Sequence, residues 1–508
     1  MLVTLTELDS DSDMLALVPC FVFALPPSLD EDGRSALVEW LKGAAERVVE
    51  KWRMLSGTPE RTKDGLWAIR LPDVDEQHPT RTTVGFSTAA YAQPYHLAAG
   101  LPSPLPPLSS SRSGVFPLTK RSFFRPSTLP QSLAGHMKHN HPLVHVHASL
   151  FPDTLAVGVS VPHGLLDGHG VGMLLQALRA ELHGEEWGVP PLWEEGENPF
   201  TAALDRLKAD ETIAAQADGE PHLSVAASWR PFSVLGLLAF LVSVLVEVFG
   251  WKSEPRRVFL RQDLIDRLVQ PVKEEVKRET GGKEFVSTGD VLVAWLLRTT
   301  QASDTNSGDN VIASAIYSPR FLLDSHSPSS SSPLSLYPSA CVFNYQLLPV
   351  PIPLSTLIST SFAALSLTFR RNLERYRSLP AIRSALFHPG SQTSPSLVPI
   401  RDSPQLPPFL RRLVPWRKKA PHTHRFFFTN QCSLGMADLS LPHPTEEGED
   451  LPLVQYCLDV DMPIVPDHMV SIQKVDGGFT MSASMRRSRW DALKRAIEEL
   501  EKARDEVL

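Results

Sequence analysis

The unit from Pro142 to Leu182 constrains the fold of this chain more than any other stretch. Hydrophobic and polar residues alternate from Val144 to Leu150 and again from Leu155 to Val161, which is typical of two strands. A glycine-rich polar turn, Pro162 to Gly170, follows, and the hydrophobic spacing then becomes helical through 171–182. The unit therefore predicts strand, strand, polar turn and helix, the beginning of a mixed α/β fold.

Helical spacing of hydrophobic residues predicts further helices on both sides of this unit. An early helix carries Leu37 to Leu55 and ends at Gly57. In the second half of the chain, Ser287 and Asp290 have the spacing of a capping box, which opens a helix. The final helix is expected to start near Ser488. The second half therefore repeats the mixed α/β character of the first.

Length and proline content indicate how these elements are divided. At 508 residues the chain is long enough for two large or three ordinary domains. We predict two α/β halves, residues 1–225 and 256–508, joined by a segment at 226–255. The chain has 45 prolines, more than average, and the excess concentrates in three loops between the predicted elements: Leu101–Pro117, Ser325–Pro338 and Pro389–Pro421.

The charge balance and the cysteines exclude two classes of protein. The 49 basic residues stand against 57 acidic ones, so we expect no binding of duplex nucleic acid. None of the four cysteines stands in a CxxC pair, which excludes a zinc ribbon or a disulfide scaffold and fits a reducing compartment. The N-terminal residues lack the basic and apolar regions of a signal peptide, so a cytoplasmic location is expected.

The polar turn after the second strand carries the strongest chemical signal. His163 directly follows that strand, and histidine accepts a proton near neutral pH without any shift of its pKa. Asp167, four residues on, could orient the imidazole or brace the turn by pairing with an arginine. With 17 histidines, one chance H-x-x-x-D is expected, so a turn with incidental polar residues stays an alternative. No G-x-S-x-G elbow accompanies the pattern, which argues against a covalent acyl-enzyme.

The stretch Val159–Gly168 resembles the H-x-x-x-D-G region of the BAHD acyltransferases, in particular their fungal, trichothecene-acetyltransferase-like branch. The resemblance implies two related α/β halves with a central channel in which acyl-CoA and a small-molecule acceptor meet. It implies acyl-CoA as co-substrate and no bound cofactor, and we expect a monomer. Further blocks follow in the family's order: Lys51–Gly57, Val286–Trp295, Tyr317–Arg320, Val342–Asn344 and Asp476–Gly478.

The resemblance also implies roles for individual residues. His163 would deprotonate an acceptor hydroxyl or amine, which then attacks the thioester directly. Asp167, with Gly168 beside it, would point away from the substrate and pair with Arg320. Positioning and proton transfer supply large rate factors without a covalent intermediate. No residues that bind CoA are identified.

The family's second signature, D-F-G-W-G, is altered in this chain. Of that motif only Asp438 remains, in the stretch Asp438–Ser440. In the family the motif is mainly structural, so its alteration leaves the proposed chemistry intact. A developing oxyanion needs a hydrogen-bond donor, and Thr429 or Asn430 is our candidate; a strand end is the alternative interpretation of that pair.

Residues Phe232 to Trp251 are almost wholly apolar. Their length meets the requirement of a membrane span, but a helix buried between two halves has the same composition. A single span would place the two halves on opposite sides of the membrane, where they could not share an active site. We therefore expect a buried helix, or one that makes peripheral contact with a membrane through residues 232–251.

Two other polar clusters have simple interpretations. Several histidines lie between His136 and His147, but no acidic or cysteine ligand stands beside them. Because His145 and His147 alternate with core valines, we expect a solvated strand face and no metal. A basic run from Arg411 to Arg425 could meet CoA phosphates or an anionic membrane surface, and a solvated loop is the simpler interpretation.

The sequence therefore predicts a CoA-dependent O- or N-acyltransferase that moves an acyl group, most simply acetyl, to a small secondary metabolite. Two alternatives stay open. A carrier-dependent condensation-type enzyme has the similar motif H-H-x-x-x-D-G, although Pro162 replaces its first histidine here. A degenerate, non-catalytic, membrane-associated binding protein would fit the altered second signature and the apolar segment.

Overall fold

The structure is a computed structural model, and parts of the chain lie outside the residues it describes. The apolar segment 232–251, the loop Pro389–Pro421 and most of the basic run are among the parts outside. The described residues are 1–5, 15–72, 84–193, 198–219, 253–302, 309–326, 334–338, 343–348, 352–387, 423–444, 446, 448–461 and 469–505.

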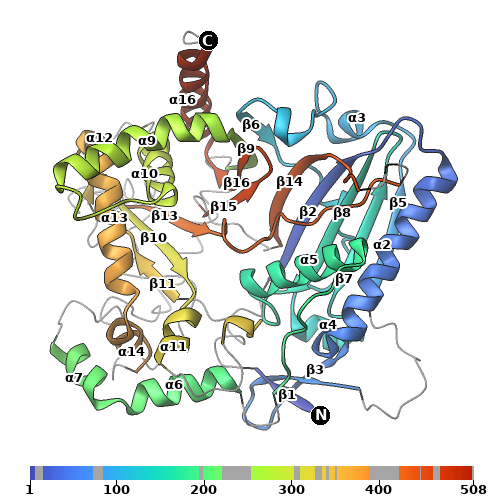
Figure 1. Ribbon diagram of the computed structural model, residues 1–508, viewed down its shortest axis with the longest axis horizontal. Helices are drawn as coiled ribbons and strands as arrows, with labels where there is room; N and C mark the ends of the chain where they lie inside the picture. The colour runs from blue at the N-terminus through green and yellow to red at the C-terminus, as the bar shows by residue number, and fades with distance from the viewer. Residues whose placement is uncertain are drawn as a thin grey trace, which may run out of the picture.

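A five-stranded mixed sheet forms the centre of the N-terminal half (Figure 1). Its strand β8 is buried along its whole length, as expected of a strand covered on both faces. Helices α2 (Glu31–Lys51) and α5 (Gly168–His183) pack on one face and share a hydrophobic core with it. In spatial order the strands are β14 (Leu453–Asp461), β2 (Ala16–Ala24), β8 (Thr154–Pro162), β7 (His145–Leu150) and β5 (Gly85–Ala90).

An eight-stranded mixed sheet forms the centre of the C-terminal half. One face packs against α9 (Gln262–Glu279), α10 (Thr288–Gln301), α13 (Phe362–Tyr376) and α16 (Arg487–Asp505). The strands, in spatial order, are β11 (Phe343–Gln346), β10 (Asn310–Tyr317), β13 (Thr423–Asn430), β15 (Met469–Val475), β16 (Gly478–Met485), β9 (Glu254–Arg261) and β6 (Gly114–Pro117), with β12 (Ile352–Pro353) paired to β10.

Smaller elements complete the described part of the chain. The N-terminal half also contains a three-stranded sheet, with the order β1 (Leu2–Thr4), β4 (Trp67–Arg70) and β3 (Thr58–Arg61). The remaining helices are η1 (Arg53–Ser56), α3 (Tyr95–Ala99), η2 (Leu108–Ser110), η3 (Arg121–Phe123), α4 (Leu133–His139), α6 (Pro199–Ala209), α7 (Glu211–Gly219), α11 (Arg320–His326), η6 (Leu334–Leu336), α12 (Leu354–Ser359) and α14 (Leu379–Phe387).

The two halves exchange strands. β14, from the C-terminal part of the chain, pairs with β2 and forms an edge of the N-terminal sheet. β6, from the N-terminal part, pairs with β9 at the edge of the C-terminal sheet. The halves are therefore joined by backbone hydrogen bonds as well as by side chains. The predicted boundaries at residues 225 and 256 stay a prediction, and each sheet takes one strand from across them.

Local signals in the sequence correspond closely to the helices observed. The side chain of Ser287 accepts a hydrogen bond from the Asp290 amide at 3.3 Å, and the Asp290 carboxylate accepts one from the Ser287 amide at 2.7 Å. The capping box is therefore confirmed. The last helix begins at Arg487, one residue before the predicted start. No helix within the described ranges is long and apolar enough to cross a membrane.

The prediction of a solvated histidine face on β7 is wrong. His145 and His147 are 8% and 4% exposed, because η3 and the residues after it lie against this face of the sheet. The Ser87 hydroxyl lies 2.8 Å from Nε2 of His145 and 2.7 Å from Nδ1 of His147. Burial lowers the pKa of His145 to about 4 and also lowers the pKa of His147. No cluster of metal-ligating side chains occurs among the residues with described positions.

Protonation of His145 is expected to destabilise the fold in mild acid. The unfolded chain binds this proton near pH 6.5 and the folded chain only near pH 4. The free energy of unfolding therefore falls as the pH drops below 6.5, by about 2 kcal/mol between pH 7 and 5 for this one group. Urea unfolding at both pH values measures it. His145→Asn should lose this part of the pH dependence, and exposed His139→Asn should keep it; equal pH dependence in both variants would contradict the assignment.

Candidate active site

His163 is held at the junction of β8 and the polar turn. Its backbone amide donates to the Leu15 carbonyl at 2.9 Å, which fixes the residue beside the start of β2. The Nδ1 atom is buried and has no hydrogen-bond partner among the described residues. Burial lowers the pKa of His163, against the opposing effects of nearby backbone groups and the Asp167 carboxylate. The imidazole is therefore neutral at pH 7, the state in which it accepts a proton.

Both carboxylate oxygens of Asp167 accept hydrogen bonds from groups other than the His163 imidazole. It is the N-cap of α5, and its Oδ1 accepts hydrogen bonds from the amides of His169 at 2.9 Å and Gly170 at 3.0 Å. Its Oδ2 accepts from Nη2 of Arg320 at 2.7 Å. Of the two roles open to Asp167 from the sequence, the structure therefore favours bracing the turn through an arginine.

Arg320 stands at the start of α11 and is nearly inaccessible to solvent. Its Nε donates to the Tyr337 carbonyl at 3.0 Å and its Nη1 to the Ser318 hydroxyl at 2.8 Å. The side chains of Arg320 and Asp167 are 1% and 2% exposed. The pair therefore ties the first turn of α5, in the N-terminal half, to the C-terminal half.

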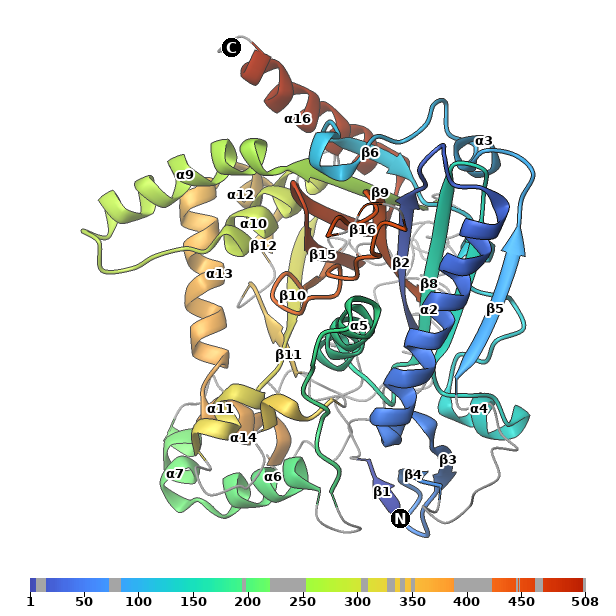
Figure 2. The ribbon, with the colours of Figure 1, turned by 45° about the vertical axis from the view of Figure 1, so that its right-hand side comes forward.

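Glycines let the C-terminal half approach α5 at backbone distance. A Cβ atom at Gly170 would lie 2.1 Å from the Pro338 carbonyl oxygen, and one at Gly172 would lie 1.7 Å from that of Leu434. At Gly168 the same atom would meet the Leu434 side chain at 3.0 Å. In Figure 2, α5 is seen nearly end-on between the two sheets. The seam between the halves thus runs along this helix.

The altered second signature lies in a segment that follows α5 towards its C-terminal end. Gly435 adopts a φ of +65°, and a side chain there would strike Gln176. Farther along, Nε2 of His183 lies 3.0 Å from the Ser440 hydroxyl. Leu439 is buried in the core of the N-terminal half. The segment packs on the helix without the family's D-F-G-W-G residues.

The two candidates for an oxyanion donor differ in their surroundings. Thr429 is buried and lies beside Ser471 in the parallel pairing of β13 with β15. Asn430 is exposed, and its Oδ1 accepts from the Cys432 amide at 3.1 Å. Its amide nitrogen lies against Gly289 in the first turn of α10. For Asn430, the interpretation as a strand end is therefore the better one.

Gln431 is a site residue that the sequence did not indicate. Its Oε1 accepts from Nε2 of Gln473 at 2.6 Å. Its own amide nitrogen lies beside the first residue of α5, 3.5 Å from where a Cβ of Gly168 would be. Spacing gave no signal for it, because the turn after β13 has no periodic pattern. Burial raises the pKa of the neighbouring Cys432 thiol to about 12, which favours the protonated thiol at neutral pH.

Comparison with known proteins gives relatives in sequence and in fold. No family model matches the chain. The chain is 29% identical over 260 residues to acetyltransferase BOT5 of Botryotinia fuckeliana, a match that covers 50% of this chain and 45% of that protein. The chain thus spans less than half the length of this relative.

The fold comparison covers nearly the whole chain. TRI101 of F. graminearum, in a structure with Coenzyme A and T-2 mycotoxin, superposes with a TM-score of 0.62 at 12% identity, covering 99% of this chain and 98% of that one. The first condensation domain of the CDA synthetase superposes with a TM-score of 0.51 at 12% identity, covering 98% and 94%. The predicted two-domain, mixed α/β acyltransferase-like fold and the resemblance to fungal acetyltransferases are confirmed.

The ion pair of Asp167 and Arg320 is expected to behave as one unit. Asp167→Asn leaves a buried guanidinium unpaired and should lower the free energy of unfolding by about 3 kcal/mol. Arg320→Met should cost a similar amount, whereas the double variant should cost clearly less than the sum of the two. Denaturant unfolding of all four proteins measures the coupling, and additive effects would show that the pair contributes nothing as a pair.

Proposed function

We propose that this protein is a CoA-dependent acyltransferase in which His163 acts as the general base. The reaction would move an acyl group, most simply acetyl, from acyl-CoA to a hydroxyl or amine of a small secondary metabolite. The observation that carries the proposal is geometric: His163 stands in the turn before α5, and the Asp167 carboxylate of that turn pairs with Arg320 of the C-terminal half. Burial lowers the pKa of His163, which favours the neutral imidazole. The similarity to a fungal acetyltransferase and to a fold found with Coenzyme A supports the donor.

The proposed reaction needs no covalent enzyme intermediate. His163 takes the proton of the acceptor as its oxygen or nitrogen forms a bond to the thioester carbon. The tetrahedral intermediate carries an oxyanion, for which the Thr429 hydroxyl is the proposed donor. The carbon–sulfur bond then breaks, and the departing thiolate of CoA takes the proton from the imidazolium. Asp167 and Arg320 position the turn that holds His163 and do not touch the substrate.

The alternatives differ from this proposal at specific residues. A condensation-type enzyme has the same fold, so the fold does not separate the two. The residue before His163 does bear on the choice, because Pro162 stands where that family has a histidine. The degenerate-protein alternative rested partly on the altered second signature. That support is weakened, because the segment from Gly435 to Ser440 still packs along α5.

Replacement of the proposed base is expected to abolish turnover. His163→Asn should lower kcat by at least about 100-fold with acetyl-CoA, since general-base catalysis contributes factors of this size. Thermal stabilisation by CoA should persist, because the variant changes a proton acceptor and not the fold. His183→Asn, at the other end of α5, is the matched control and should stay within a few-fold of wild type. Undiminished turnover in His163→Asn would refute the assignment.

The pH profile is expected to carry the signature of a buried base. Since burial lowers the pKa of His163 below the usual 6.5, the deprotonated form persists into mild acid. The acid limb of kcat/KM should therefore have an apparent pKa below 6.5, and activity should be lost only as the pH falls through that lower value. Initial rates between pH 4.5 and 8 would test this. A limb at or above 6.5 would mean that another group titrates.

A further inference from the structure

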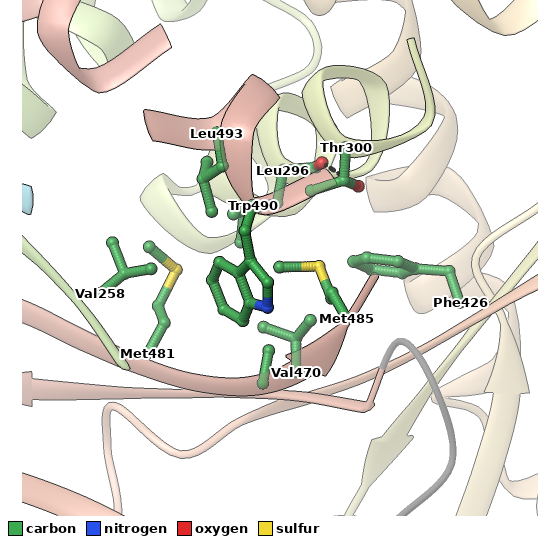
Figure 3. A pocket seen from close by; sticks show the side chains of 10 residues that line it. Val258, Leu296, Thr300, Phe426, Val470, Met481, Met485, Trp490 and Leu493 are labelled. Carbon is green, nitrogen blue, oxygen red and sulfur yellow. Dashed lines mark hydrogen bonds between the residues drawn. The ribbon is translucent and has the colours of Figure 1, made fainter. Parts of the chain in front are cut away.

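The two faces of the eight-stranded sheet differ in their chemistry. Val258 and Met481 point into a small apolar cavity between the sheet and helices α10 and α16, with room for about one water (Figure 3). Successive side chains of a strand point to opposite faces. Their neighbours Arg257 and Ser482 therefore project from the other face, as Ser471 does on β15. This second face is polar where the first is apolar.

The polar face is turned towards the N-terminal half. Thr480 lies on it, and its hydroxyl donates to the Tyr456 carbonyl of β14 at 3.3 Å. Phe259, which follows the same alternation on β9, belongs to the hydrophobic core of the N-terminal half. The face is therefore part of the boundary between the halves, as is the proposed reaction centre.

Four residues on this face form a row that we call the polar ladder: Thr429, Ser471, Ser482 and Arg257. Each is the direct partner of the next in the register of β13, β15, β16 and β9. Three strand spacings of about 4.8 Å place the two ends about 14 Å apart. All four are buried, with exposures of 9%, 5%, 9% and 2% in that order.

Polar atoms along this face lack partners. The Ser482 hydroxyl and Nε of Arg257 are buried and have no hydrogen-bond partner in the part of the chain that the structure describes. Oε1 of Gln473, two residues from Ser471 on the same face, is in the same state. Unpaired buried polar atoms are costly, and a folded protein rarely keeps several together without a reason. A bound group with acceptor oxygens would accept hydrogen bonds from two of them, the Ser482 hydroxyl and Nε of Arg257.

No carboxylate of the described residues neutralises the charge of Arg257. Its guanidinium lies over the Phe116 ring, 5.0 Å from the centroid. Its titratable neighbours are Tyr95 and Cys457, and burial raises the pKa of Tyr95, which keeps the phenol neutral. Arginine stays protonated in proteins, so a buried positive charge stands at this end of the ladder.

The other end of the ladder lies near the first turn of α5, the helix that follows the turn carrying His163. Thr429 is the proposed oxyanion donor, and Gln431, two residues later, lies beside the first turn of α5. Gln473 connects the two, because its Nε2 donates to Oε1 of Gln431 at 2.6 Å and to the Ser471 hydroxyl at 2.8 Å. A group that enters the ladder from the reaction centre would meet hydroxyls first and the guanidinium last.

We propose that the polar ladder binds the part of the substrate that ends in a carboxylate, and that Arg257 holds this carboxylate. The inference rests on the proposed acyl transfer and names its substrate class: an anionic acyl group or an anionic acceptor. One guanidinium among neutral hydroxyls balances one negative charge, which fits a carboxylate better than a phosphate dianion. Its planar fork also matches a carboxylate in two parallel hydrogen bonds.

The test compares ligands that differ in the carboxylate alone. Calorimetry on the full chain would measure the affinity for decanedioyl-CoA against decanoyl-CoA, a donor pair with equal carbon count and a chain long enough to span the ladder. It would also measure 10-hydroxydecanoate against its methyl ester in the presence of CoA, an acceptor pair. Wild type should prefer the carboxylate in one pair by at least about 10-fold, the usual strength of a hydrogen bond to a charged group. The pair that shows the preference identifies which substrate carries the carboxylate.

Variants at adjacent positions separate Arg257 from its surroundings. Arg257→Met should abolish the preference and raise the melting temperature of the free protein by about 2 °C, because an unpaired buried charge is removed. Arg256→Met is the matched control: Arg256 projects from the other face and pairs with Glu254, so the preference should persist. Arg257→Lys keeps the positive charge but lacks the planar guanidinium, so it should retain a weakened preference for the carboxylate ligand. This variant tests the inference if Arg257→Met does not fold.

Three results would overturn the inference: no preference in either pair with wild type, a preference that survives Arg257→Met, or a loss in that variant confined to CoA against 3′-dephospho-CoA. The last result would assign Arg257 to a phosphate of CoA. Failure of the acyltransferase proposal is recognised separately, by absence of CoA binding or by full turnover in His163→Asn. The acceptor pair still tests Arg257 in that case, since binding needs no transfer.

Discussion

The buried ion pair between Asp167 and Arg320 is the interaction on which the rest of the site depends. One carboxylate caps α5 with one oxygen and neutralises a guanidinium of the opposite half with the other. Helix, turn and seam are thereby fixed by a single side chain. The pair needs both members, because a lone charge at this depth would cost several kcal/mol. This arrangement positions the turn that carries His163, and burial lowers the pKa of His163.

Close approach of the halves follows from the same helix. Gly170 and Gly172 leave room for the carbonyls of Pro338 and Leu434, so backbone from the C-terminal half lies directly on α5. The exchanged strands β14 and β6 hold the halves in register from the outer edges of the two sheets. Rigid contact at the helix and continuous hydrogen bonding at the edges suit a site that is assembled from both halves and has to keep its geometry.

Patterns in the sequence predicted those structural features that depend on residues close together in the chain. The turn at His163, the capping box of Ser287 and the last helix depend on residues within a few positions of each other, and the sequence indicated all three. The pairing of Asp167 with Arg320 needed the family resemblance, because 153 residues separate them. His145 was misjudged because its cover comes from η3, which no alternation within β7 could disclose.

The polar ladder could not be predicted from the sequence for a similar reason: its members come from strands far apart in the chain, and only the strand register aligns them.

Two buried arginines, Arg320 and Arg257, differ in what surrounds their charge. Arg320 donates to a carbonyl, a hydroxyl and a carboxylate, and the carboxylate neutralises its charge. Arg257 has an aromatic ring and neutral groups around it. Among the residues that the structure describes, no carboxylate pairs with Arg257, and a partner that arrives with the substrate explains a buried charge in this state.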